Sequence, residues 1–265
     1  MPQKNDLRGR IAGQSAMAAV IEAQSDRSPR GLLARIVGVS PLTAAGRAHY
    51  RGAVGELLVG SILDHLGHSW DVLHGVPLGK TSLDHFAVGR AGVFAISVVN
   101  CQGDDVAVNG DELVIAKTIS GAITNARASA HRVGVTLSEA RSSTVEVVAV
   151  LVVVNPVKLS MLALPKDVHI LTSMQLEQWL LSSPVVLSGE EVATLSTIAE
   201  SADTWPPAQE VVTHSRNITR AFVRIHHDVR TASARRFFWV VTALILTFLS
   251  VWSLVSVLTE LVVTS

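Results

Sequence analysis

Two carboxylates and one uncharged strand raise the question of metal chemistry in the middle of this chain. Glu56 lies in GAVGE and Asp84 in LDHFAVG, but the next apolar run, AGVFAISVVNCQG (residues 91–103), has no carboxylate or amine side chain. Carboxylate oxygens hold hard divalent cations such as Mg²⁺, and a basic group helps to activate the attacking water. Residues two apart in a strand share a face, so an acid and a lysine there could both reach the metal. Ser97 and Val99 occupy two such positions.

Ser97 and Val99 supply little of that chemistry. A serine hydroxyl is neutral and at most a weak ligand for a divalent cation. Val99 has no proton to transfer, and a positioned acid or base typically contributes about 10²- to 10⁴-fold in rate. With Val93, Ala95 and Val99 around Ser97, this face of the strand is typical of a packed core rather than a hydrated metal site.

Hydrophobic periodicity places these residues on a definite order of elements. Spacings of three and four residues predict helices, and short apolar runs between glycine-containing turns predict strands. The predicted order is a helix over 52–67, strands over 69–78, 82–89 and 92–100, a hairpin around Asn109-Gly110, a helix over 120–140 and an apolar strand over 145–155. This order predicts an α/β fold with a mixed sheet.

The same segments resemble the nuclease-related domain (NERD) family, a branch of the PD-(D/E)XK, or restriction-endonuclease-like, superfamily. GAVGE resembles the family's opening Gly-x-x-Gly-Glu helix, VLHGVPL its first strand and LDHFAVG its Asp-His strand. GVFAISVVNCQG is similar to the strand that ends in acid-x-Lys-Asn-x-x-Gly, and LTSMQLEQWL and LSGEEVATLSTI are similar to the closing helices. The resemblance covers residues 52 to about 204 and implies an α-β-β-β-α-β core.

The resemblance also implies a vestigial catalytic site. Glu56 matches the family's helix glutamate and Asp84 its first strand aspartate, so these two would hold Mg²⁺ if the protein is active. Ser97 and Val99 replace the acid and the lysine, so we expect no cofactor and an impaired nuclease. A displaced lysine could be Lys80, before the second strand, or Lys117, after the hairpin. Asn125 is a further candidate, on a helix where the family often has glutamine.

The histidines and the cysteine have simpler interpretations. His65, His68, His74 and His85 match no standard ligand spacing, and we expect them at the surface. Cys101 is the single cysteine, so it forms no internal disulfide, which favours a reducing cytoplasm. No motif places a base beside Cys101, and we expect a passenger thiol.

Charge divides the chain into three parts although the net charge is zero. Residues 1–51 have eight basic and three acidic residues (+5), residues 52–215 have eight and seventeen (−9), and residues 216–265 have six and two (+4). Phosphate contacts require Lys or Arg, so the acidic middle part makes nucleic acid the less favoured partner.

The last part contains a membrane signal. Residues 237–259 are 23 uncharged residues, a length of about 34 Å as a helix against a hydrocarbon core of roughly 30 Å. Arginines and an aromatic cluster precede this stretch, which is typical of a cytoplasmic helix end. The first three of six arginines recur every fourth residue and would share one helix face. The six could bind anionic lipid headgroups or nucleic acid phosphates, and the nearby membrane favours lipid: Arg216, Arg220, Arg224, Arg230, Arg235 and Arg236.

These patterns predict five segments. They are a basic helical extension (1–51), a NERD-like domain (52–204), a hinge and basic juxtamembrane helix (205–236), a transmembrane helix (237–259) and a short external tail (260–265). Two helices are predicted in the extension, over 7–23 and 32–37. The extension could lie on the membrane, pack on the domain or remain disordered.

Three functions fit this organisation. The first is a single-pass protein of the cell membrane whose cytoplasmic NERD-like domain is a pseudonuclease, acting as a binding or structural module. The second is a weakened metal-dependent DNA nuclease tethered to the membrane. The third is a scaffold that binds lipid or protein through its basic flanks, with the protein partner unidentified.

Overall fold

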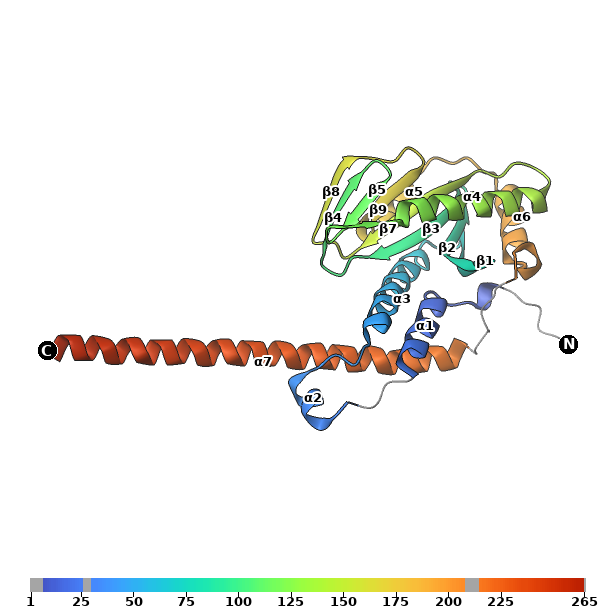
Figure 1. Cartoon of the computed structure of the whole chain (residues 1–265). Helices are drawn as coiled ribbons and strands as arrows, with labels where there is room; N and C mark the ends of the chain where they lie inside the picture. Colours follow the sequence, from blue (N-terminus) through green and yellow to red (C-terminus); the bar gives the residue numbers. More distant parts are fainter. Residues whose placement is uncertain (1–6, 26–29, 208–214, 265) are drawn as a thin grey trace.

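The computed structural model describes residues 7–25, 30–207 and 215–264, which form an α/β domain and one long helix that extends away from it (Figure 1). The core follows the predicted α-β-β-β-α-β order. It consists of α3 (Ala44–Leu63), β1 (Trp70–Leu78), β2 (Thr81–Gly89), β3 (Gly92–Asn100), α4 (Ala122–Arg141) and β7 (Val147–Val154). β9 (Val168–Thr172), α5 (Ser173–Ser182) and α6 (Gly189–Glu200) complete the domain.

The main sheet is mixed, as predicted. Its strand order is β1-β2-β3-β7-β9. β1, β2 and β3 pair antiparallel, and β3, β7 and β9 pair parallel. The apolar run of β7 lies in the middle of the parallel part and is covered on both faces, which explains its lack of alternation.

Side chains of β3 alternate between two hydrophobic clusters. Phe94 and Ile96 pack with residues of α3 and α5 on one face of the sheet. Val93 and Ala95 pack with residues of α4 and α6 on the other. The domain therefore has helices on both faces, and β3 belongs to both halves of the core.

A second sheet lies beside the first. It contains β4 (Asp105–Asn109), β5 (Glu112–Ile115), β6 (Thr118–Ser120) and β8 (Lys158–Ala163), in the order β6-β5-β4-β8. The predicted hairpin is confirmed, because Asn109 pairs with Glu112 across the turn. β8 and β9 were not expected from the sequence, since both are short and β8 is largely exposed.

The N-terminal segment packs on the rest of the protein. The helix predicted over 32–37 is confirmed as α2 (Leu32–Val37), whereas the one predicted over 7–23 is divided into a short 3₁₀ helix (Leu7–Gly9) and α1 (Gln14–Ser25). α1 lies against α3 and α7, with Met17, Val20, Tyr50 and Phe222 in one buried cluster. Of the three arrangements that the sequence left open for the extension, α1 therefore shows the second, packing on the folded protein. α3 begins eight residues before the predicted start, at an N-cap formed by Thr43.

The segments predicted as juxtamembrane and transmembrane form one continuous helix, α7 (Ser215–Thr264). The helix has no break at residue 236, where the sequence changes from basic to apolar. Trp205, placed by the sequence in the hinge, is buried and donates from Nε1 to the carbonyl oxygen of Ala199. The rest of that hinge, residues 208–214, and Ser265 of the tail lie outside the described residues.

Most of the apolar half of α7 is exposed among the side chains that the structure describes. Among the described residues, one helix is long and apolar enough to cross a membrane, over Asn217–Ser253, and its most apolar part has no buried residue. Phe238, Leu246 and Trp252 are each more than half exposed. This half is therefore not the core helix of the domain, and Figure 1 shows it projecting alone.

Candidate functional site

The strands β2 and β3 separate at Asp84. Their ladder runs from Gly89 paired with Gly92 to His85 paired with Ile96, and ends there. β3 continues to Asn100, paired on its other side with β7. Asp84 is the first residue of β2 beyond the ladder. The backbone of β3 would have unpaired groups at this fork unless side chains reached them.

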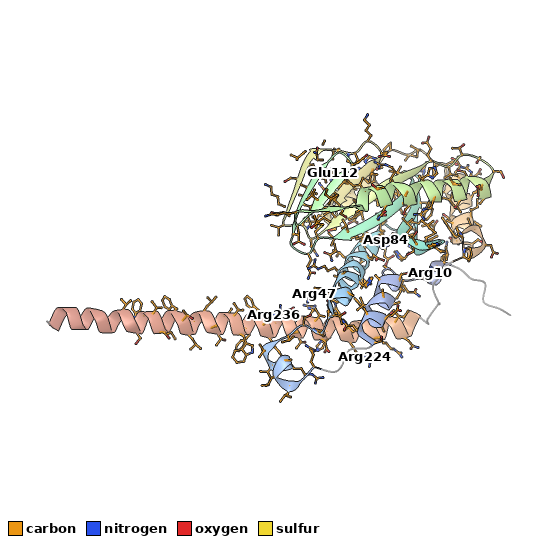
Figure 2. All side chains as sticks on the ribbon, viewed as in Figure 1. Arg10, Arg47, Asp84, Glu112, Arg224 and Arg236 are labelled. Carbon is orange, nitrogen blue, oxygen red and sulfur yellow. The ribbon has the colours of Figure 1, made fainter. Side chains whose placement is uncertain are left out.

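The Asp84 carboxylate meets that need. Its Oδ2 accepts a hydrogen bond of 2.7 Å from the backbone N–H of Val98. Burial raises the pKa of Asp84 to about 6, although this hydrogen bond acts in the opposite direction. Figure 2 shows Asp84 on the side of the domain toward α3, well separated from Glu112 in the second sheet. One oxygen of this carboxylate is thus committed to the backbone of β3.

Ser97 and Val99 lie next to this fork, on β3. Their Cα partners on β7 are Leu151 and Val153. Val99 packs against the cluster that contains Val153 and the α4 side of the sheet. Ser97, by alternation, shares this face. The position that could place a cation near Asp84 is therefore part of an apolar layer.

Glu56 lies on α3 and is partly buried. Its Cβ is 3.5 Å from where a Cβ on Gly13 would stand, and its Oε1 is 4.0 Å from the equivalent point on Gly52. This carboxylate therefore lies beside the start of α1. The neighbouring Gly55 faces β3, and successive helix residues point about 100° apart. Glu56 therefore points about 100° from the direction of Gly55 around the helix axis.

A close approach of α3 to β3 holds the fork together. A Cβ on Gly55 would stand 3.0 Å from Cβ of Asn100 and 3.3 Å from Cγ1 of Val98, so only glycine fits without adjustment. Asn100 donates from Nδ2 to the carbonyl oxygen of Arg51 and accepts from the N–H of Gln102. Asn100 therefore ties α3 to the turn after β3.

The remaining candidate residues lie elsewhere. Lys80 is exposed in the turn between β1 and β2, four residues of extended strand from Asp84, or about 13 Å along the chain. Lys117 is exposed in the turn between β5 and β6 of the second sheet, and Asn125 is exposed in the first turn of α4. Within the described residues, no group of three or more His, Cys, Asp or Glu side chains is placed to hold a metal ion.

The comparisons with known proteins identify this region. The family model of the nuclease-related domain, NERD, matches residues 51–153. Residues 51–153 form a NERD domain. The match begins within α3 and ends within β7. Placement in the PD-(D/E)XK superfamily is consistent with this match. Neither the search of curated proteins nor that of solved structures found a match.

Two histidines of the NERD domain are buried, contrary to the prediction of surface histidines. His74 and His85 oppose each other on β1 and β2, and their Nδ1 atoms are 2.9 Å apart. His74 Nε2 lies 3.3 Å from Oδ1 of Asp64. A carboxylate only accepts, so His74 donates from Nε2 and accepts at Nδ1 from His85. Nε2 of His85 is then a buried acceptor without a partner among the described residues.

Burial determines the charge state of this pair. Burial, followed by the nearby His74, lowers the pKa of His85 well below its usual value. His85 is therefore neutral at physiological pH. The pair could have been predicted by placing the turn between β1 and β2 at Gly79 and Lys80. That turn sets the register of the two strands, which brings His74 opposite His85.

The cysteine and the α7 arginines are the last of the candidate residues. Cys101 is buried, and burial, reinforced by Asp104, raises the pKa of its thiol to about 11, so it is an inert side chain. On α7, Arg220, Arg224 and Arg230 are exposed. The side chain of Arg216 lies outside the described ones.

Proposed function

We propose that this protein is a catalytically impaired NERD-domain protein, anchored to the cell membrane by α7, whose cytoplasmic domain is a binding or structural module. The carrying observation is the fork between β2 and β3. There Asp84 is used to pair the N–H of Val98, and the neighbouring positions hold Ser97 and Val99. Such a site lacks a second strand carboxylate and a lysine amine.

Electrostatics support impaired catalysis. Mg²⁺ sheds water reluctantly and needs strong oxygen donors in near-octahedral geometry. Asp84 offers one carboxylate oxygen that is not already bound to Val98, and Glu56 is directed beside α1. Val99 contributes no charge to a developing oxyanion. The chain's own residues at the fork therefore stabilise the strand ends rather than a phosphodiester transition state.

The exposed apolar half of α7 supports membrane anchorage. An isolated helix with Phe238, Leu246 and Trp252 exposed to water would be costly, whereas a bilayer buries all of these side chains. Arg235 and Arg236 immediately precede the aromatic residues, an order typical of the cytoplasmic interface. The domain therefore lies on the cytoplasmic side in this proposal.

The basic part of α7 would then meet the lipid headgroups. Arg220, Arg224 and Arg230 are exposed on the helix as it approaches the apolar stretch (Figure 2 labels Arg224 and Arg236). Each arginine near an anionic surface contributes about 1 kcal/mol of attraction. Anionic lipid is therefore the partner that we propose for this flank, including Arg216, Arg235 and Arg236.

A nuclease assay on the full chain in detergent, with Mg²⁺ and with Mn²⁺, tests the catalytic part. We expect no cleavage of plasmid or single-stranded DNA above that of the Asp84→Ala variant. A variant that restores the family pattern, Ser97→Glu with Val99→Lys, is the matched comparison. Cleavage by the natural sequence that is lost in Asp84→Ala would refute the proposal and favour a weakened nuclease. Cleavage that persists in Asp84→Ala indicates a contaminating enzyme.

Membrane fractions of cells that express the full chain test the anchorage. We expect the protein to remain in the membrane pellet after extraction at alkaline pH. A protease added outside intact cells should leave the domain uncut. Release at alkaline pH, or cleavage of the domain from outside, would contradict the anchorage or the orientation respectively.

A further inference from the structure

The short helix α2 is fixed to α7 at the point where α7 becomes apolar. Three carbonyl oxygens at the C-terminal end of α2 accept hydrogen bonds from α7 side chains. Arg235 Nη1 donates to the oxygen of Arg35 at 2.9 Å, Trp239 Nε1 to that of Ile36 at 2.9 Å, and Arg236 Nη2 to that of Gly38 at 3.3 Å. The oxygen of Arg35 also accepts from the backbone N–H of Gly38 at 3.3 Å, and α7 supplies the side-chain donors to this end of α2.

The backbones of α2 and α7 also touch at Gly38. This residue caps α2 in the left-handed conformation, with φ of +81°. A Cβ here would stand 2.5 Å from the carbonyl oxygen of Ala232, and Ala232 itself is buried. Arg30 adds an ion pair of 3.3 Å to Asp228 and a hydrogen bond to the oxygen of Val39. α2 therefore has a defined position on α7.

The outer face of α2 is apolar and exposed. Leu32 is 75% exposed, Leu33 78%, Ile36 45% and Val37 54%. These positions follow the i, i+1, i+4, i+5 spacing of one helix face. Four large apolar side chains within six residues are far more than a water-facing helix normally presents. We therefore expect another apolar surface to bury this face of α2.

A polar cavity of about 260 Å³ lies between α2 and α7, beside that apolar face. Its lining includes Arg30, Arg35, Arg235, His227 and Asp228. Asp228 pairs with Arg30, and Arg235 also bonds the carbonyl oxygen of Arg35. The Arg35 side chain is exposed and makes no hydrogen bond or ion pair among the described residues. Three guanidinium groups against one carboxylate leave the cavity positively charged.

We infer that α2 and the adjoining part of α7 form a binding site for an anionic phospholipid at the membrane surface. The phosphate lies in the arginine-lined cavity, where Arg35 and Arg235 donate to it, and Leu32, Leu33, Ile36 and Val37 contact the acyl chains. Guanidinium groups suit phosphate oxygens because they can donate two hydrogen bonds in one plane. This inference rests on the proposed membrane anchorage.

Continuity with the apolar half of α7 identifies the cover as a bilayer. α2 lies beside the last charged turn of α7, and Trp239 bonds it at the first turn of the apolar stretch (Figure 1). Tryptophan favours the headgroup level of a bilayer. A short amphipathic helix held at that level buries its apolar face in the boundary between headgroups and acyl chains. The positive charge of the cavity and the apolar face of α2 therefore both match an anionic phospholipid of the bilayer.

Depth-dependent fluorescence quenching on the full chain tests this inference. An environment-sensitive dye is attached to Leu33→Cys, in vesicles of phosphatidylcholine alone or mixed with phosphatidylglycerol, with nitroxide-labelled lipid as the quencher. Val251→Cys, in the apolar half of α7, reports anchorage, and Met174→Cys, 91% exposed on α5, is the aqueous control. The buried thiol of Cys101 gives the background labelling, measured on the natural sequence.

We expect lipid quenching at residue 33, stronger when phosphatidylglycerol is present, and none at residue 174. Arg35→Glu should lower the ratio of inserted to detached α2 about 30-fold in the mixed vesicles, since it changes two elementary charges near an anionic surface. It keeps the docking, because α2 contacts α7 through main-chain oxygens. Arg90→Glu, the same change in the exposed turn between β2 and β3, should leave the ratio unaltered.

Each other outcome overturns a specific part. Quenching at residue 251 without quenching at residue 33 refutes the α2 site and leaves the anchorage standing, with the apolar face then open to a protein. Quenching at residue 33 that ignores phosphatidylglycerol and Arg35→Glu refutes the headgroup site. Absence of quenching at residue 251 refutes the proposed anchorage itself.

Discussion

Replacing Asp84 by asparagine should make the protein more stable at neutral pH and no more stable in acid. Asparagine has nearly the same shape, and its Oδ1 can still accept the hydrogen bond from the N–H of Val98. The substitution removes only the charge, whose burial is unfavourable. The sign follows from the raised pKa: below the pKa of the unfolded chain, Asp84 is protonated in both states and the penalty is absent.

The magnitude comes from the two pKa values. The pKa of Asp84 rises from 3.8 to about 6 on folding, and each pKa difference of one corresponds to about 1.4 kcal/mol. The free energy of unfolding of the natural protein should therefore fall by about 3 kcal/mol through this group as the pH rises from 3.8 to 6. Above pH 6 the loss is complete, and Asp84→Asn avoids it.

The assay is urea unfolding of the full chain in one detergent, followed by the fluorescence of buried Trp205, at several pH values between 3.5 and 7.5. The difference in free energy between Asp84→Asn and the natural protein should grow by about 3 kcal/mol over this range. Asp203→Asn, at an exposed carboxylate, controls for net charge. A difference that stays constant with pH, or that grows toward acid, would refute the burial argument.

Asp84→Ala separates the charge from the hydrogen bond. It relieves the same burial of charge but leaves the N–H of Val98 without its acceptor, at a cost of about 1–3 kcal/mol. We therefore expect Asp84→Ala to be less stable than Asp84→Asn at every pH. Equal stability of the two variants would show that the bond to Val98 contributes nothing.

Three further changes test the packing around the fork and around α2. Gly55→Ala should lower the free energy of unfolding by about 1–3 kcal/mol because its Cβ would crowd β3. Gly52→Ala, whose Cβ would make ordinary 4.0 Å contacts, should instead raise it by up to about 1 kcal/mol. Equal stability of the two variants in urea unfolding would contradict the close approach of α3 to β3. Gly38→Ala should release α2 and speed amide exchange over residues 32–37, and Gly31→Ala, whose Cβ meets nothing within 4 Å, should not. The pKa of His85 is lowered on folding, so the natural protein should lose up to about 1.4 kcal/mol per pH unit as the pH falls below 6.5; His85→Leu should reduce this loss in pH-dependent unfolding, and an unchanged slope would contradict a neutral buried His85.

The sequence by itself determined the order of the core elements, the charge deficit of β3 and the apolar length within α7. These are local properties. Period, turn residues and composition are read from residues adjacent in the chain, and they suffice to place α3, β1, β2, β3, α4 and β7 in an α/β core. Ser97 and Val99 are uncharged whatever surrounds them, so the missing acid and lysine are visible without coordinates.

Only the tertiary structure decided which groups meet. Asp84 caps the backbone of β3 because β2 diverges at that residue, and His74 and His85 are buried because the register of two strands opposes them. The docking of α2 on α7 joins residues about 200 positions apart, such as Arg35 and Arg235. Such contacts depend on distances between segments that are remote in the chain, and no local pattern carries that information. The sequence specifies which residues are ionisable, but the pKa and the partner of each such residue depend on the groups that folding brings beside it.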